Sequence, residues 1–473
     1  MAITIQQTPL STYGFSPLPI GQQVIFAVSE PTIVANKFKV KFVAQIHVSR
    51  NPINLGGTPI GTFKTTPNNK GVGIFDLRPV LETFVKSDNE GSTYGNGSRY
   101  KQATSVPVAQ AVTHPMHLID KFAMSENAIR YFAINFFVEY SETATGDIID
   151  FTNLDPEPTE QYTMFNGVLQ YDDVLTLNKG NYGYDLLKNA YNGFYLAETG
   201  NFLSNAPSTQ YARLTDYGTL PFLNFLPTSA DRVANIVLTY YWDGGSSTET
   251  VNQSWTAGGV TNFTNQVFQH LLYFGAFPGN LQNWSTIFAS AISSGLTHYT
   301  ILANSDISTT SRMTTINIIC PNERGYEGIR LTWLNQWGVW DYYTFNMKST
   351  RSISTKRIPY TQLGGTWNDR TFKISGYKGG KKNFRVNSTE KIKLNTDFVS
   401  EAEGVWFEEL INSPEVYIVN GFSADAVDTI TNKYIEPVTL TTSSYVIKTI
   451  ANDKLMQYTI EIEKSKMKRT QAV

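Results

Sequence analysis

The chain has 473 residues and a formal net charge of -2, with 16% charged and 41% hydrophobic residues. This length corresponds to roughly three domains, and the hydrophobic residues are enough to fill their cores. The small net charge gives no electrostatic case for binding nucleic acid or an anionic membrane. An internal disulfide scaffold is excluded, because Cys320 is the only cysteine. A lone cysteine in an apolar run is typical of a small buried side chain.

The amino terminus lacks the basic region, apolar core and cleavage site of a signal peptide. No apolar run reaches the ~18 residues of a membrane span. We therefore expect synthesis in a cytoplasm and no membrane insertion. Low charge together with abundant Thr, Asn, Tyr and Phe is typical of β-rich extracellular or virion proteins.

Two segments near the amino terminus alternate apolar and polar side chains, which predicts half-buried strands. Residues 37–49 place Phe38, Val40 and Phe42 on one face and lysines on the other. Residues 129–140 alternate in the same way.

The segment between these strands changes its period. Residues 71–85 begin extended and then fit a short helix with Pro79 in its first turn, where a missing N–H costs little. Residues 86–118 are rich in Gly, Ser, Asn and Thr, which predicts a long loop, here called the excursion. We therefore expect a β-sandwich domain with one short helix over residues 1–150. Residues 151–200 are predicted to be a connecting segment with some strand pairing.

A second β-sandwich domain is predicted over residues 201–348. Residues 234–243 alternate as a strand and end in the turn 243–245. Residues 265–273 carry apolar side chains at helical spacing, which predicts a helix. Further strands are expected at residues 298–303 and 316–320.

The segment 330–345 is the most informative part of this domain. It holds three of the eight tryptophans, two tyrosines and one phenylalanine. Its pattern predicts a β-hairpin with a turn at residues 335–338, where Gly338 supplies the backbone freedom that a tight turn needs. Aromatic cross-strand pairs stabilise such hairpins.

The remaining residues, 349–473, predict a C-terminal β-rich domain with one short helix and a basic tail. Residues 378–384 are expected to form a basic, flexible loop. Residues 401–411 fit a helix with acidic residues early in it, which ends at Ser413-Pro414. Short strands are expected at residues 415–419, 435–440, 445–448 and 455–463. The predicted fold class is mainly β and multidomain, with antiparallel, immunoglobulin-like β-sandwich units and a few short helices.

The sequence contains no recognised catalytic, nucleotide or cofactor motif. His114 and His117 are close together, but their spacing is not a recognised zinc pair and no cysteine lies nearby. We expect no metal, no cofactor and no enzymatic activity.

Glycoside hydrolysis remains as a catalytic alternative, because glycosidases use a pair of carboxylates and the chain has several. Glu401, Glu403, Glu408 and Glu409 could supply such a pair, or they could form a solvated helix face. Asp341 lies between Trp340 and Tyr342 and could hold a sugar; the alternative is that these rings pack into the sheet.

The basic tail contains Lys464, Lys466, Lys468 and Arg469. It is either a frayed, solvated end or a contact with DNA or with an acidic surface of a partner chain.

Three patterns resemble structural proteins of tailed bacteriophages, especially those infecting Bacteroidetes and marine hosts. The first is the aromatic run 333–345, and the second is residues 73–81 followed by 82–85. The third is a terminal pattern of residues 413–417, Pro437-Val438, Tyr445 and residues 457–461.

The resemblance implies a virion component of the tail, baseplate or head–tail connector, made in the host cytoplasm. Such a subunit would bind itself in a symmetric ring and would contact other virion proteins. Two alternatives stay open: a protein that binds a host-surface glycan or receptor, and a glycan-cleaving enzyme of the virion. The candidate interaction residues are Trp333, Trp337, Trp340, Asp341, Tyr342, Lys466, Lys468 and Arg469.

Overall fold

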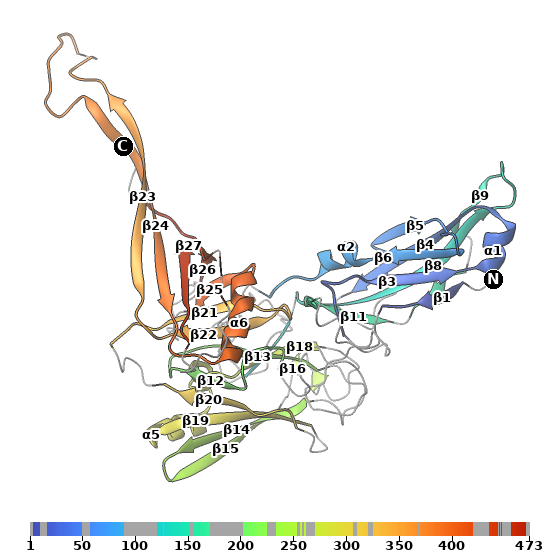
Figure 1. Cartoon of the computed structure of the whole chain (residues 1–473), viewed down its shortest axis with the longest axis horizontal. Coiled ribbons are helices and arrows are strands. Elements are labelled where there is room, and N and C mark those ends of the chain that lie inside the picture. The colour runs from blue at the N-terminus through green and yellow to red at the C-terminus, as the bar shows by residue number, and fades with distance from the viewer. Residues whose placement is uncertain are drawn as a thin grey trace. The chain divides into compact units, whose positions relative to one another are not determined.

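The computed structural model of the chain consists mainly of β-strands arranged in separate sheets (Figure 1). It describes residues 3–9, 17–49, 57–88, 121–125, 127–151, 155–159, 161–170, 202–224, 233–252, 256–257, 260–261, 270–305, 310–319, 325–367, 369–419, 435–442, 444, 446 and 456–469. Most strand pairs in this part are antiparallel, and the helices are few and short. The predicted mainly β class is confirmed. No helix within the described ranges is long and apolar enough to cross a membrane.

The chain divides into two compact units. Unit 1 comprises Met1–Ile319, Leu334–Tyr342 and Gly421–Thr431. Unit 2 comprises Cys320–Trp333, Tyr343–Asn420 and Asn432–Val473. The aromatic hairpin therefore starts in unit 2, places its tip in unit 1 and returns to unit 2.

The amino-terminal part of unit 1 consists of two sheets whose aromatic side chains meet. The smaller sheet has the order β1-β3-β6, and the larger has the order β2-β11-β8-β4-β5, with β9 and β10 also paired to β8. Phe26 lies 5.7 Å from Phe136 and 5.6 Å from Tyr162 between ring centroids, and Phe75 lies 5.6 Å from Phe136. The elements are β1 (Thr4–Gln7), β2 (Pro17–Pro19), β3 (Ile25–Ser29), α1 (Pro31–Asn36), β4 (Phe38–Ser49), β5 (Gly61–Thr65), β6 (Val72–Asp76), α2 (Arg78–Leu81), η1 (Glu82–Phe84), β8 (Ile129–Ser141), β9 (Ile148–Ile149), β10 (Glu157–Pro158) and β11 (Tyr162–Phe165).

The predicted strands and the short helix after β6 are present, with two differences. Phe38 is exposed rather than on the apolar face, because the pairing of β4 with β8 shifts register between Phe38 and Lys41, and Lys39 has a φ of 53°. The predicted connecting segment 151–200, in which some strand pairing is expected, contributes β11, which pairs with β8 and so belongs to this sandwich. The predicted excursion 86–118 lies outside the described residues after residue 88.

A second group of strands in unit 1 forms a five-stranded sheet, β12-β20-β19-β14-β15. Helix α5 packs on it through Phe288, whose ring lies 5.4 Å from Tyr240 and 5.8 Å from Tyr299. The predicted turn after β14 is confirmed, since Trp242 pairs with Gly245 and Gly244 has a φ of 84°. The elements are β12 (Thr209–Ala212), β14 (Val233–Trp242), β15 (Gly245–Asn252), α4 (Pro278–Leu281), α5 (Thr286–Ser293), β19 (Leu296–Ser305) and β20 (Thr314–Ile318), with β16 (Thr256–Ala257) paired to β17 (Val260–Thr261).

The predicted helix over residues 265–273 is wrong for residues 270–273, which are the part of it that the structure describes. Residues from His270 onward form β18 (His270–Gly275), the middle strand between β13 (Thr219–Asn224) and β7 (Phe122–Met124). The side chains from Leu271 to Phe274 are all buried, so both faces of this strand are covered. A short, continuously apolar run cannot be assigned to helix or strand by periodicity alone.

A buried carboxylate joins distant segments of unit 1. Asp88 accepts hydrogen bonds from the Ser125 hydroxyl (2.6 Å), the Asn127 backbone N–H (2.7 Å) and the Tyr273 hydroxyl (2.9 Å). Its backbone carbonyl accepts a bond from Nε1 of Trp340 at 3.1 Å. A charge taken out of water needs such partners. Burial, reinforced by the Asp88 charge, raises the pKa of Tyr273 well above its usual value, so this hydroxyl keeps its proton and donates it to the hydrogen bond.

Unit 2 is built on an eight-stranded sheet with the order β22-β21-β25-β26-β27-β24-β23, and β28 pairs with β24. The predicted helix at residues 401–411 is confirmed as α6, whose start is fixed by a capping box between Ser400 and Glu403. The prediction of a loop at residues 378–384 is wrong from Gly380 onward, where β24 begins. The elements are β21 (Ile329–Leu334), β22 (Trp340–Phe345), β23 (Thr350–Gln362), β24 (Gly380–Asn395), α6 (Glu401–Asn412), β25 (Val416–Val419), β26 (Ile435–Leu440), β27 (Thr459–Lys464) and β28 (Lys468–Arg469).

Two turn glycines allow a test of the packing around the hairpin tip. Gly338 (φ 70°) and Gly244 (φ 84°) both adopt a conformation that side chains disfavour by ~1–2 kcal/mol. A Cβ at Gly338 would overlap the carbonyl oxygen of Asn166, whereas a Cβ at Gly244 would meet nothing within 4 Å. We expect Gly338→Ala to lower the free energy of unfolding by a further ~1–3 kcal/mol compared with Gly244→Ala. Urea unfolding of both variants measures this, and equal losses would contradict the close approach at Asn166.

Candidate interaction surfaces

The base of the aromatic hairpin is the packing partner of α6 in unit 2. Trp333 is fully buried, and its ring centroid lies 4.8 Å from that of Trp406. On the other strand of the hairpin, Tyr343 meets Phe407 edge-on at 4.7 Å. Aromatic pairs in this geometry add to the stabilisation from buried area. Trp333 therefore belongs to the core of unit 2.

The tip of the hairpin is organised by one asparagine. Oδ1 of Asn335 accepts hydrogen bonds from the backbone N–H groups of Trp337 (3.0 Å) and Val339 (3.2 Å). Its Nδ2 donates to the carbonyl of Leu203 at 3.0 Å. The N–H of Gly338 donates to the Asn335 carbonyl at 3.0 Å, which closes the turn. The predicted turn at residues 335–338 is confirmed.

The remaining aromatic candidates are held by other residues of unit 1. Nε1 of Trp337 donates to Oδ1 of Asn205 at 3.3 Å, and the Tyr342 hydroxyl shares a hydrogen bond with the Thr219 hydroxyl at 3.0 Å. Trp340 is held at the Asp88 carbonyl, as described above. All five hairpin candidates are buried within this chain: Trp333, Trp337, Trp340, Asp341 and Tyr342. A glycan platform needs an exposed ring face, and these rings lack one.

The carboxylates considered for glycoside chemistry belong to α6. Glu401 and Glu403 lie in its first turn, where a negative charge favours the helix, and Glu403 completes the capping box. Among the described residues no group of three or more His, Cys, Asp or Glu could hold a metal ion. His114, His117 and Cys320 lie outside the described residues.

The basic tail is partly ordered and folds back on its own unit. Lys468 and Arg469 form β28, paired with Ser388 and Asn387 of β24, so these two residues are not a frayed end. The Lys468 carbonyl accepts a bond from the Ser388 hydroxyl at 3.1 Å. Lys466 is exposed between β27 and β28.

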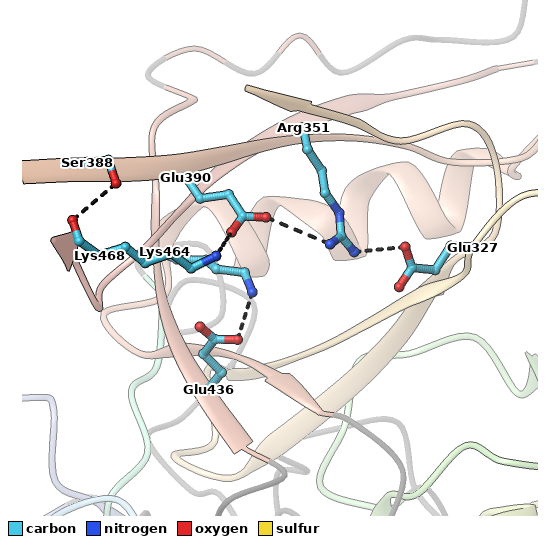
Figure 2. A network of polar contacts seen from close by, with 7 residues as sticks. All are labelled: Glu327, Arg351, Ser388, Glu390, Glu436, Lys464 and Lys468. Atoms are coloured by element: carbon cyan, nitrogen blue, oxygen red, sulfur yellow. Dashed lines mark hydrogen bonds and ion pairs between the residues drawn. The ribbon is translucent and has the colours of Figure 1, made fainter. Parts of the chain in front are cut away.

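Glu390, in β24, is the centre of the ionic network that receives this tail (Figure 2). Its carboxylate lies 3.0 Å from Nζ of Lys468 and 3.8 Å from the guanidinium of Arg351. Arg351 also pairs with Glu327 at 2.8 Å. The hydrogen bond from Lys468 lowers the pKa of Glu390; desolvation acts in the opposite direction, and the nearby cations reinforce the decrease. The carboxylate is therefore ionised at neutral pH, and the network fixes the tail to β24.

A second surface, which the sequence analysis did not predict, begins beyond this network. Residues 352–386, here called the arm, form a two-stranded ribbon from β23 and the outer part of β24, with a loop between them (Figure 1). Residues 391–395 of β24 also pair with β27, whereas residues 380–386 pair only with β23 among the described strands. Nearly every residue of β23 is exposed. The arm is thus a ribbon that no second layer of described residues covers.

The tip of the arm, residues 363–379, is locally ordered but presents apolar side chains to solvent. The Thr366 backbone N–H donates to the Lys373 carbonyl at 3.1 Å, and its hydroxyl donates to the Thr371 carbonyl at 2.9 Å. The Trp367 and Phe372 rings pack edge-on at 5.4 Å. The exposed fractions are 68% for Leu363, 69% for Trp367, 58% for Phe372, 88% for Ile374 and 74% for Tyr377. Five large apolar side chains so close together form a patch, rather than the scattered single residues normal on a surface.

The arm is also strongly basic. It contains eight lysines and arginines and a single acidic residue, Asp369, so its net charge is +7. Among the described residues, none of these eight cations has an ion pair with a carboxylate of this chain. Sequence reasoning missed the surface because β23 lacks a clean apolar alternation. The available signal was the two glycine pairs, Gly364-Gly365 and Gly379-Gly380, that flank the tip.

No protein-family model matches the sequence, and no curated protein matches it. The candidate surface therefore rests on the residues themselves.

Substitution of one tryptophan in the hairpin and one in the arm tests which of the two is buried. Trp337→Ala should lower the free energy of unfolding by ~3–5 kcal/mol, because it removes a buried ring. Trp367→Ala, which removes an exposed ring, should change it by no more than about 0.5 kcal/mol. Chemical denaturation followed by circular dichroism measures both. A large decrease in the free energy of unfolding for Trp367→Ala, or no decrease for Trp337→Ala, would contradict these placements.

The ionic network predicts a pH-dependent contribution to stability. Because the folded-state pKa of Glu390 is lowered, its contribution is fully present above the unfolded pKa of a glutamate and is lost as pH falls through the folded pKa. We expect wild type to be more stable than Glu390→Gln at pH 7, with the difference shrinking in acid. The exposed Glu408→Gln serves as the control and should match wild type at pH 7. A difference between wild type and Glu390→Gln that persists unchanged to low pH would refute the network's role.

Proposed function

We propose that the chain is a structural subunit of a tailed-phage virion, in the tail, baseplate or head–tail connector, and that it works by assembly. It would contact copies of itself in a symmetric ring and other virion proteins. The observation that carries this proposal is the arm with its exposed apolar tip. The resemblance of the three sequence patterns supplies the virion setting.

The physical argument starts from the stability of a ribbon. An isolated two-stranded hairpin is marginally stable in water, and the arm residues cover little of one another's surface. Large exposed apolar patches mark protein contacts or ligand sites in soluble proteins. Aromatic residues also supply much of the energy at protein interfaces. An arm of this kind gains its stability by packing on another chain.

A host-surface glycan receptor is the second candidate function, and the tip also favours it. Trp367 and Tyr377 are exposed rings of the kind that stack on sugars, in contrast to the buried Trp337 and Trp340. Glycan-array binding that disappears in Trp367→Ala while assembly is unchanged would favour this role over the structural one.

The oligomeric state tests the structural proposal. Native mass spectrometry of the full chain over a range of concentrations should show a closed oligomer of defined copy number, and particles should contain the chain in stoichiometric amounts. A chain that stays monomeric at high concentration and does not join particles would contradict the proposal.

A further inference from the structure

We infer that copies of the chain assemble through a heterologous contact, in which the arm of one copy binds the body of the next copy and does not bind another arm. The body here means all residues outside the arm, 1–351 and 387–473. This inference rests on the proposed assembly function and names the kind of contact that would produce it. The alternative is an isologous contact, in which the same surface of two copies, here the two arms, meets about a twofold axis.

The charge of the arm opposes contact between two arms. The ribbon part of the arm, residues 352–362 and 380–386, holds five lysines and arginines and no acidic residue. The tip, residues 363–379, adds three cations and one carboxylate, that of Asp369. Two arms in contact would therefore bring +7 against +7. Like charges that face each other across an interface suppress association.

The outer edge of β23 leads to the same conclusion. β23 lies at the end of the strand order of its sheet, so none of the described strands pairs with this edge. Lys356 is the middle residue of β23 and Arg357 follows it, so twofold pairing of two β23 strands about their midpoint would place cations opposite cations. Pro359 has no N–H to donate to a partner strand. Charges and prolines of this kind prevent edge strands from joining.

The body carries the charge that the arm needs in a partner. The chain holds 38 Lys and Arg and 40 Asp and Glu. The arm takes eight of the cations and one of the anions, so the body holds 30 and 39 and has a net charge of -9. Surfaces of opposite charge attract and steer association. In a chain that assembles with itself, the arm of one copy is therefore drawn to the body of another.

The apolar tip adds a short-range contribution and favours a protein surface over nucleic acid. Single-stranded nucleic acid is held by cations and by aromatic rings on which bases stack. The most exposed large apolar side chain among the described residues is instead aliphatic, Ile374, at 88%. Leu363 is exposed as well, at 68%. Covering these side chains removes apolar surface from water, which stabilises a contact with another protein surface.

A heterologous contact determines the symmetry of the assembly. Each copy gives its arm to one neighbour and receives the arm of the other neighbour. Copies joined in this way form a closed ring when the rotation between them closes, and an open filament when it does not. The ring of the proposed function is the closed form, and twofold contacts between arms are absent from it.

A chain with a shortened arm distinguishes the two kinds of contact. Arg357 and Val386 are direct partners in the ribbon, so an Asn-Gly turn in place of residues 358–385 closes the shorter hairpin. This variant keeps its body but loses the tip and most of the ribbon, and alone it should stay monomeric in native mass spectrometry. Mixed with wild type, it should accept one wild-type arm and give open species that contain a single variant copy. In a contact between arms the variant could not join at all.

Two controls accompany the mixing experiment. Mass-tagged wild type should enter closed rings in any proportion, and circular dichroism should show that the shortened variant is folded. A point variant, Trp367→Ala with Ile374→Ala, keeps the whole arm and should weaken the association constant by at least about tenfold. Its matched control, Tyr211→Ala with Phe398→Ala, removes two exposed rings outside the arm and should leave the constant unchanged. Equal losses for the two double variants would contradict the role of the tip.

Ionic strength provides a test by the sign of its effect. Salt screens the attraction between arm and body, so the association constant of the wild type should fall as NaCl rises from about 0.05 to about 0.3 M. Salt would instead screen the repulsion between two arms, and the constant would then rise.

The outcomes separate this inference from the proposed function. The heterologous arm contact is overturned, and the structural role stands, if the shortened variant is absent from mixed species while wild type assembles, or if the association constant rises with salt. A chain that never assembles contradicts both. If shortening the arm leaves assembly unchanged but abolishes binding of a fluorescent oligothymidine, the arm is a nucleic-acid element and the inference is overturned.

Discussion

A two-stranded ribbon has no second layer on which to pack its side chains, and this constraint governs the C-terminal unit. One continuous strand, β24, serves both the sheet and the arm. Its inner part pairs with β27 and buries Ile392 and Leu394, whereas its outer part pairs with β23 alone and is mostly exposed. At the transition, Glu390 binds Lys468, so β28 is fixed where the sheet ends (Figure 2). The base of the arm is anchored in the core of unit 2. No core of described residues surrounds its outer part.

The rest of the described chain shows that the exposed tip is not a general consequence of the aromatic composition. Elsewhere many of the large rings are buried: Phe26, Phe136 and Tyr162 meet inside the amino-terminal sandwich, and Trp333 packs on Trp406. Among these buried rings, Nε1 of Trp340 donates to the Asp88 carbonyl. Exposed rings outside the arm, such as Phe38, Tyr211 and Phe398, are far apart in the sequence, whereas residues 363–377 hold several large exposed apolar side chains together, among them Trp367 and Tyr377.

The amino-acid sequence predicts the local elements well and the surfaces poorly. The strands at residues 38–49 and 129–141 follow from alternation, the turn at Asn335 follows from its residues, and α6 follows from spacing and its acidic start. The fully buried strand β18 was mistaken for a helix because burial on both faces removes the period. Whether Trp333 is a core residue depends on Trp406, which is distant in the sequence. The arm escaped prediction because its strands have no buried face to impose a pattern.

The central claim is that the arm becomes buried when copies of the chain assemble. Hydrogen exchange followed by mass spectrometry, on monomer and on assembled oligomer, measures this directly, because amides in a marginal ribbon exchange quickly unless another chain covers them. Our account predicts that residues 352–386 gain strong protection on assembly, while β14 and β19 change little. Exchange in the arm that is equally fast before and after assembly would contradict it.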